Sequence, residues 1–367
     1  MGVRLHLAIG EGLAVFAIAG DVDYGEIALE ESPLNELTYD DALTPSRIST
    51  NLLYPVARSF RIAPTPDHLS RADELRGIQG EVPRLIEGYS PVGILGERAY
   101  PKDLTWLFEL AGFEGVRTAG NGVITDPDGA TIPTGASRWV FNKRDDLQAK
   151  SARIKTNYWR EGVQLQGYGF GVSAMSISAM AELSADWMGL FLRRIASDAT
   201  VPVISAAAIP PFRRGDLYLS ALAGGGRVAD WSLAIANPIE RVNSLSLDPP
   251  SRWPDALELA EGQVAVTGSI PKRLLDATDY DALVAATTFA MTARWKTPTN
   301  IGATNYKYSL WCQMPAAQYI SGEAEELVGS RRRHGHSFDW FAAWDEAAGY
   351  DVRWTLVNDV TAIATFV

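Results

Sequence analysis

The sequence predicts a mainly β fold, an antiparallel β-sandwich or barrel with one or two short flanking helices. Two observations support this class. Apolar and polar residues alternate along many segments, which is the period of strands and not of helices. The chain also holds 11 Trp, 13 Tyr and 12 Phe among its 367 residues, and aromatic residues favour strands. A chain of this length can bury a large core, as one large domain or two ordinary ones.

The longest alternating stretch covers residues 158–187. Its phase changes twice, first in the glycine run of Gly167, Gly169 and Gly171 and again near Ser173 and Ala174. Because glycine tolerates unusual backbone angles, we expect a long ribbon that bends at these positions. Such a ribbon needs strands along both edges, supplied by this chain or by its neighbours. Its apolar residues are the candidate self-assembly residues: Val163, Leu165, Tyr168, Phe170, Val172, Met175 and Ile177.

Residues 1–59 are predicted to form N-terminal strands and an acidic arm. Residues 21–46 contain eight Asp and Glu and no Lys or Arg. One interpretation is a solvated acidic loop, and the other is an arm whose charge acts on another subunit. In the second interpretation Asp21, Asp23, Glu30 and Glu31 contribute to self-assembly.

Residues 60–197 form a predicted first half. The stretch 101–113 has an amphipathic helical pattern, with Pro101 suited to its first turn and Gly112 to its C-terminal end. Asn121-Gly122 is a hairpin signal, and an Asp-Pro-Asp-Gly turn follows at 126–129. Trp139 and Phe141 then begin the strands that lead into the central ribbon.

Residues 198–228 are rich in Ala, Pro and Gly and form the predicted junction, which leaves 229–367 as a second half. This half begins with alternating Trp231, Leu233 and Ile235, has a short helical pattern at 278–286, and continues with alternating strands over 289–295, 306–314 and 352–356. Both halves therefore share an order of strands, one short helix and long strands. Without a residue-level repeat, a fusion of two copies of one fold is a hypothesis from pattern alone.

The composition excludes several functional classes. The net charge of −11 argues against a surface that grips nucleic-acid backbone. The single Cys312 excludes an intramolecular disulfide and a multi-cysteine metal site. No segment has the uninterrupted apolar length of a membrane span, so we expect a soluble intracellular product.

The motifs give no candidate catalytic, cofactor-binding or metal-binding residue, and we expect a protein that is not an enzyme. The run GYGFGV at 167–172 lacks the following helix that a dinucleotide loop needs, and a bend in a strand explains it better. His334 and His336 have no evident third metal ligand, and a solvated basic loop explains them better.

Five segments resemble the major tail tube protein family of long-tailed bacteriophages. They are SPVGIL at 90–95, PKDLTWLFELAG at 101–112, the stretch 158–183, DWSLAIANPIERVNSLSL at 230–247 and ATTFAMTARWKT at 286–297. The resemblance covers roughly residues 60–367 and rests on pattern and length, because this family has no invariant catalytic motif. It implies a β-sandwich or barrel with a flanking helix, related to the lambda-type tube and to the haemolysin-coregulated tube of secretion systems.

The resemblance also implies a function and partners. Subunits of such proteins close into rings that stack into a tube, and the genome passes through the lumen without specific binding. Known rings are hexameric, so a chain with two copies of the fold would form a trimer. The implied partners are further copies of the chain and the tape measure, tail terminator and tail-tip proteins. The implied location is the virion tail, after synthesis in the host cytoplasm. The alternative, based on the 11 Trp, is a carbohydrate-binding or receptor-binding β-sandwich of a virion or cell surface.

Overall fold

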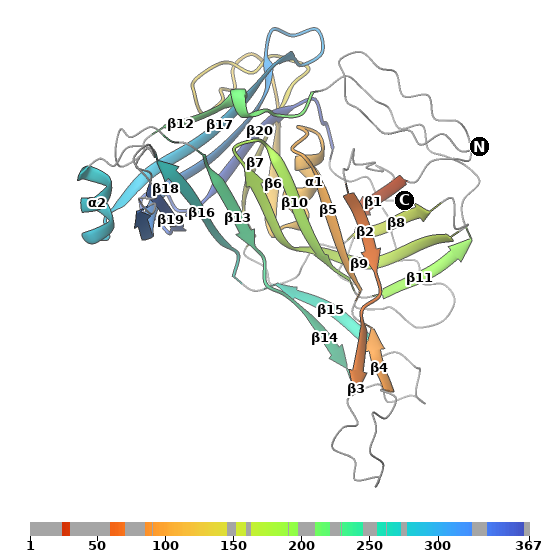
Figure 1. The fold of residues 1–367 in the computed structure, drawn as a ribbon. Coiled ribbons are helices and arrows are strands. Elements are labelled where there is room, and N and C mark those ends of the chain that lie inside the picture. The colour runs from red at the N-terminus through yellow and green to blue at the C-terminus, as the bar shows by residue number, and fades with distance from the viewer. Residues whose placement is uncertain are drawn as a thin grey trace, which may run out of the picture.

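The computed structural model describes residues 24–29, 59–69, 85–89, 91–144, 152–158, 163–189, 191–196, 210–220, 228, 230–244, 255–261, 263–272, 277–324 and 336–362. These residues form one 16-stranded sheet and two separate two-stranded hairpins (Figure 1). All the pairings between strands are antiparallel, which confirms the predicted mainly β class. Among the described residues, the path of the large sheet runs from β2 to β6 and does not close into a barrel.

The elements of the first half are β1 (Tyr24–Leu29), β2 (Ser59–Ala63), β3 (Pro66–Leu69), β4 (Leu85–Tyr89), β5 (Val92–Arg98), α1 (Asp103–Leu110), β6 (Phe113–Ala119), β7 (Ser137–Lys143), β8 (Ala152–Tyr158), β9 (Val163–Ser178), β10 (Glu182–Met188) and β11 (Phe191–Ala196). Those of the second half are η2 (Arg214–Asp216), β12 (Leu217–Ser220), β13 (Ser232–Ala236), β14 (Ile239–Ser244), β15 (Asp255–Glu261), β16 (Ala265–Lys272), α2 (Ala277–Val284), β17 (Thr288–Asn300), β18 (Lys307–Ala324), β19 (His336–Ala343) and β20 (Arg353–Asn358). Residues 217–220 of the predicted junction are therefore a strand, which pairs with β17.

β9 is the long ribbon that the sequence predicts, and it bends at both predicted places. Gly169 has a φ of +64°, and the register against β8 shifts beside it. Ala174 pairs with Asp186 of β10, and Val172 pairs with the next residue, Trp187. Ser173 between them is therefore an extra residue, a β-bulge. Because of these bends the first half of β9 pairs with β8 and β11, whereas its second half pairs with β10 and β13.

α1 confirms the predicted first helix. It begins at Asp103, so Pro101 precedes the first turn and does not lie within it. The helix ends where Gly112 takes a φ of +87°, a left-handed conformation that glycine adopts without strain. All eight helical residues are buried, and α1 packs on β6, β7 and β9.

One continuous core runs through both halves. Its largest fully buried side chains include Trp231, Trp295, Trp340 and Trp354. The ring of Trp231 lies 5.3 Å from that of Trp295 and 6.3 Å from that of Trp340. Because the same core includes α1 and β9 of the first half, apolar burial ties the two halves together.

The strand pairings of the first half recur in the second. In the first half, β2 pairs with β5, β5 with β10, β10 with β9, and β9 with β8 and β11. In the second half, β13 pairs with β16, β16 with β19, β19 with β18, and β18 with β17 and β20. β1 on β8 corresponds to β12 on β17, and the hairpin β3–β4 to β14–β15. Both hairpins extend from the lower end of the sheet in Figure 1.

The register of the repeat is conserved in detail. Ser59 pairs with Gly96, and 173 positions later Ser232 pairs with Ser269. A helix follows the second strand of each pair, α1 after β5 and α2 after β16. The described part of the second half has no counterpart of the hairpin β6–β7. The two halves are therefore topological repeats, with one hairpin inserted into the first.

Candidate assembly edges

Four of the predicted self-assembly residues are buried in the core of one chain. Phe170, Val172, Met175 and Ile177 are each at most 1% exposed, and half-buried Leu165 packs against the same core. Val163 and Tyr168 occupy the part of β9 between β8 and β11. Strands of the same chain thus fill both edges of β9. The side chains of Phe170, Val172, Met175 and Ile177 therefore belong to the core of one chain. A role of Val163 and Tyr168 in assembly stays a prediction.

The predicted acidic arm lies largely outside the described residues. Asp21, Asp23, Glu30 and Glu31 are among the residues that the structure does not describe. The residues between them, 24–29, form β1, which pairs along its length with β8. This part of the acidic segment is therefore a strand of the chain's own sheet, and its predicted role in assembly stays a prediction.

The two halves meet at a first joint, where β13 adds to the free edge of β9. Ser232 lies opposite Ser178 and Ala236 opposite Ala174. The side-chain amide of Asn237, fully buried, donates to the carbonyl oxygen of Val172 at 3.0 Å and extends the joint by one residue. The first strand of the second repeat is thus added to the long strand of the first repeat, a head-to-tail contact.

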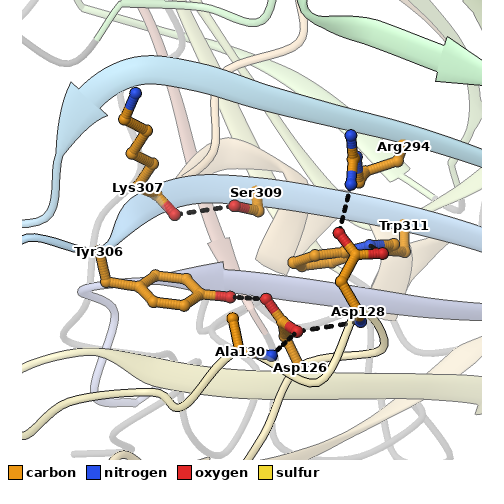
Figure 2. Close-up of polar contacts among 8 residues, drawn as sticks. All are labelled: Asp126, Asp128, Ala130, Arg294, Tyr306, Lys307, Ser309 and Trp311. Carbon is orange, nitrogen blue, oxygen red and sulfur yellow. Dashed lines mark hydrogen bonds and ion pairs between the residues drawn. The ribbon is translucent and has the colours of Figure 1, made fainter.

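A second joint is formed by the inserted hairpin, since β7 pairs with β20. The loop between β6 and β7 reaches over β17 and β18, where its Asp-Pro-Asp-Gly turn is held by side chains of the second half (Figure 2). Asp128 forms an ion pair with Arg294 and accepts a hydrogen bond from the indole of Trp311 at 3.3 Å. The predicted turn is therefore also a contact between halves.

Asp126 is the most enclosed acid of this loop. Its Oδ1 accepts hydrogen bonds from the backbone N–H groups of Asp128, at 2.9 Å, and Ala130, at 2.8 Å. Its Oδ2 accepts a hydrogen bond from the hydroxyl of Tyr306 (Figure 2). Burial raises the pKa of Tyr306, and the hydrogen bond to Asp126 raises it further. The Tyr306 hydroxyl therefore keeps its proton and serves as a permanent donor.

The repeat leaves one open edge at each of its ends. β2 begins the path of the sheet, and its only strand partner among the described residues is β5. The last part of β18, residues 321–324, is paired in the described structure with β19 alone, because the pairing of β18 with β17 ends at Gln318. Figure 1 shows β18 and α2 on one side of the molecule and β2 on the other.

Exposed apolar side chains gather at these two edges. Val92 and Ile94 of β5, beside β2, are 39% and 47% exposed. Ile320 of β18 is 59% exposed, and on α2, which packs on β18, Tyr280 and Val284 are 55% and 68% exposed. Unpaired strand edges with adjacent apolar surface are sites where further strands add.

A second notable feature is a buried pair of carboxyl groups in the first half. Glu97 of β5 and Asp103 of α1 are 2% and 7% exposed. Burial raises the pKa of Asp103 to about 7, and burial followed by the charge of Asp103 raises the pKa of Glu97 well above its ordinary range. Near neutral pH this pair therefore holds protons that exposed carboxyl groups have lost.

Glu97 also lines an open depression of about 400 Å³, with Ser59, Ser176 and Ser184 among its neighbours. No histidine is among the described residues that line this depression. In the described part of the chain no three His, Cys, Asp or Glu side chains gather as metal ligands. His334 lies outside the described residues, and His336 begins β19.

The tryptophans are mostly internal. Eight of the nine described tryptophans are buried, and Trp344, at 65% exposure, is the exception. A sugar-binding surface usually presents aromatic faces to solvent, and these eight rings are enclosed by the core. In addition, no helix among the described residues is long and apolar enough to cross a membrane.

The local sequence pattern does not identify β2 or the end of β18 as assembly edges. A usable signal was present, because Phe60 and Ile62 alternate as Leu233 and Ile235 do 173 positions later. That signal comprises only a few residues and becomes evident once the pairings are known. Comparison with protein-family models and with curated protein sequences found no match for this chain.

Proposed function

We propose that this chain is a structural virion protein whose copies join edge to edge into rings, and that the rings stack into the tail tube of a long-tailed bacteriophage. The genome would pass through the lumen. In this proposal the chain has a structural role and catalyses no reaction. Its partners are further copies of itself and the tape measure, tail terminator and tail-tip proteins.

One observation carries the proposal: the chain is a head-to-tail repeat whose two ends carry unlike open edges. Inside the chain, the first strand of the second repeat already completes the long strand of the first. The first strand of the first repeat and the long strand of the second lack this contact in the described structure. A head-to-tail contact of this kind generates a closed ring or a helical filament when it is repeated.

Charge and composition support the same proposal. The net charge of −11 gives a wall that repels phosphate, so DNA can move past it with few sticking points. A ring of three such chains would contain six repeats, which is the number that the tail tube resemblance implies.

The test is negative-stain electron microscopy of the purified chain at high concentration, with light scattering on the same sample. We expect rings or stacked hollow tubes, and the mass of the smallest ring gives the number of chains. A chain that stays monomeric from low to high salt, with and without tail-tip protein as a template, would overturn the proposal.

A further inference from the structure

The internal joint between the halves is a template for a joint between chains. In the internal joint, β13 lies on the edge of β9 that β10 leaves open, with Leu233 opposite Ile177 and Ala234 opposite Ser176. The repeat relates β13 to β2 and β9 to β18. The equivalent contact is therefore between β2 of one chain and the open end of β18 of another.

The register of this contact follows from the pairings. Ile177 lies opposite Leu183 of β10, as Gly322 lies opposite Phe338 of β19, so Gly322 takes the place of Ile177 and Ser321 that of Ser176. Phe60 and Arg61 precede Leu233 and Ala234 by 173 positions and pair with β5 as those residues pair with β16.

We propose that β2 of one chain pairs antiparallel with residues 321–323 of β18 in a second copy, with Phe60 opposite Gly322 and Arg61 opposite Ser321. The inference rests on the proposed ring assembly and identifies the surfaces that form it. The partner is a second copy because the contact repeats one that the chain already makes with itself.

The apolar residues fit this pairing. Phe60 is half-buried on β2 and would lie beside Gly322, whose side-chain position is filled by Leu283 of α2 and Phe338 of β19. Phe60 would therefore add to an apolar cluster that is already present on that face of β18. The exposed Ile94 pairs with Arg61 of β2, and the exposed Ile320 lies two residues before Gly322 on β18, so both would lie at the same joint. Pairing would therefore remove apolar surface from water on both sides.

The charges fit it as well. On the solvent face of the internal joint, the row across three strands is Ala234, Ser176 and Ser184, which are all uncharged. The equivalent row between chains is Arg61, Ser321 and Asp339, since Asp339 pairs with Ser321 and accepts a hydrogen bond from its hydroxyl at 2.7 Å. Two strand spacings span about 10 Å, which an arginine side chain can bridge toward an aspartate.

Within its own chain, the described strands place an acid at a similar separation from Arg61 on the same face. Asp186 lies two strands away across Ile94. No ion pair joins these two side chains in the described structure, and both are exposed. Arg61 therefore remains available to an acid on a neighbouring chain.

The test is a charge swap in the full-length chain. Arg61→Glu places a carboxylate two strands from Asp339 of the next copy on the same face of the sheet, and Asp339→Arg places two arginines there. Each single variant should fold normally by circular dichroism and raise the concentration needed for half-assembly by about tenfold or more, because like charges at an interface repel. The double variant Arg61→Glu/Asp339→Arg should assemble nearly as well as the natural chain.

The mismatched double variant Arg61→Glu/Glu346→Arg is the control, because Glu346 is exposed in the turn after β19 and away from the joint. It should stay as defective as Arg61→Glu. If the natural chain assembles but the swap gives no rescue, or Arg61→Glu assembles normally, this joint is wrong while the ring proposal stands. A natural chain that never assembles overturns both.

Discussion

Glu97 and Asp103 bring two carboxyl groups into the core of the first half. Both are buried, and burial raises the pKa of each, for Asp103 from 3.8 to about 7. Neither oxygen of Glu97 has a hydrogen-bond partner in the structure. The folded chain therefore binds protons at pH values where the unfolded chain has already released them. Stability contributed in this way is greatest at low pH and is lost as the pH rises toward the raised pKa.

The first prediction concerns this pH dependence. The free energy of unfolding should fall by about 1–4 kcal/mol between pH 4 and pH 7, because each unit of pKa shift corresponds to about 1.4 kcal/mol. Urea unfolding at a series of pH values measures it. Glu97→Gln should flatten the dependence, whereas Glu114→Gln, which changes an exposed carboxyl group of β6, should leave it intact. Equal slopes for these two variants would contradict the assignment.

Tyr306 gives a second prediction at this scale. Its hydroxyl donates to buried Asp126, whose other oxygen is satisfied by two backbone N–H groups. Tyr306→Phe removes the donor and leaves a buried acceptor, so we expect a loss of about 1–3 kcal/mol in the free energy of unfolding. Tyr280→Phe, at a 55% exposed site on α2, should change it by less than about 0.5 kcal/mol. A similar small effect for both would mean that water replaces the Tyr306 hydroxyl.

At the scale of elements, α2 is positioned by a buried ion pair. Lys272 at the end of β16 lies 2.5 Å from Asp279 of α2, and both side chains are fully buried. The hydroxyl of Tyr319 on β18 also donates to Asp279, at 3.2 Å. These contacts fix the helix against β16 and β18, next to the open end of β18. The helix thus forms one wall of the proposed joint.

Removing only the lysine of this ion pair should lower the free energy of unfolding strongly. Lys272→Met leaves the Asp279 carboxylate buried without its cation, and we expect a loss of about 3–5 kcal/mol in the free energy of unfolding. The double variant Lys272→Met/Asp279→Leu removes both charges and should lose clearly less. Denaturant unfolding of the three chains compares them. If the double variant is the least stable, the pair contributes net stability beyond its desolvation cost.

At the scale of the whole molecule, the two repeats are interlocked. Along the sheet, four strands of the first half are followed by five of the second, and then by β7 and β6 of the first half. The core is also continuous across both halves. Each half has the same internal strand pairings, but its sheet and its core are completed only by contacts with the other half.

This interlocking predicts a single cooperative unfolding transition. The Arg61→Glu chain is suited to the measurement, because it is expected to stay dissociated. Its calorimetric and van't Hoff enthalpies should agree, and far-ultraviolet and tryptophan signals should change together. Two separated transitions would show that the repeats unfold as independent units, in spite of the β9–β13 and β7–β20 pairings.

Much of the local structure was determined by the sequence itself. Alternation identified β9, β13, β17, β18 and β20, glycine and phase changes located the bends in β9, and helical patterns located α1 and α2. These features depend on a few neighbouring residues, so a local pattern is sufficient to reveal them. The mainly β class followed from the same patterns, whereas the repeated order of elements was only a hypothesis.

The tertiary structure decided which strands pair. A period of two shows which face of a strand is buried, but backbone hydrogen bonds are alike in all strands and do not name a partner. For this reason Phe170, Val172, Met175 and Ile177 were predicted at an interface and lie in the core of one chain. The repeat of pairings, the joint of β13 on β9 and the open edges at β2 and β18 depend on contacts between distant residues. A local sequence pattern does not reveal such contacts, and the tertiary structure is needed to identify them.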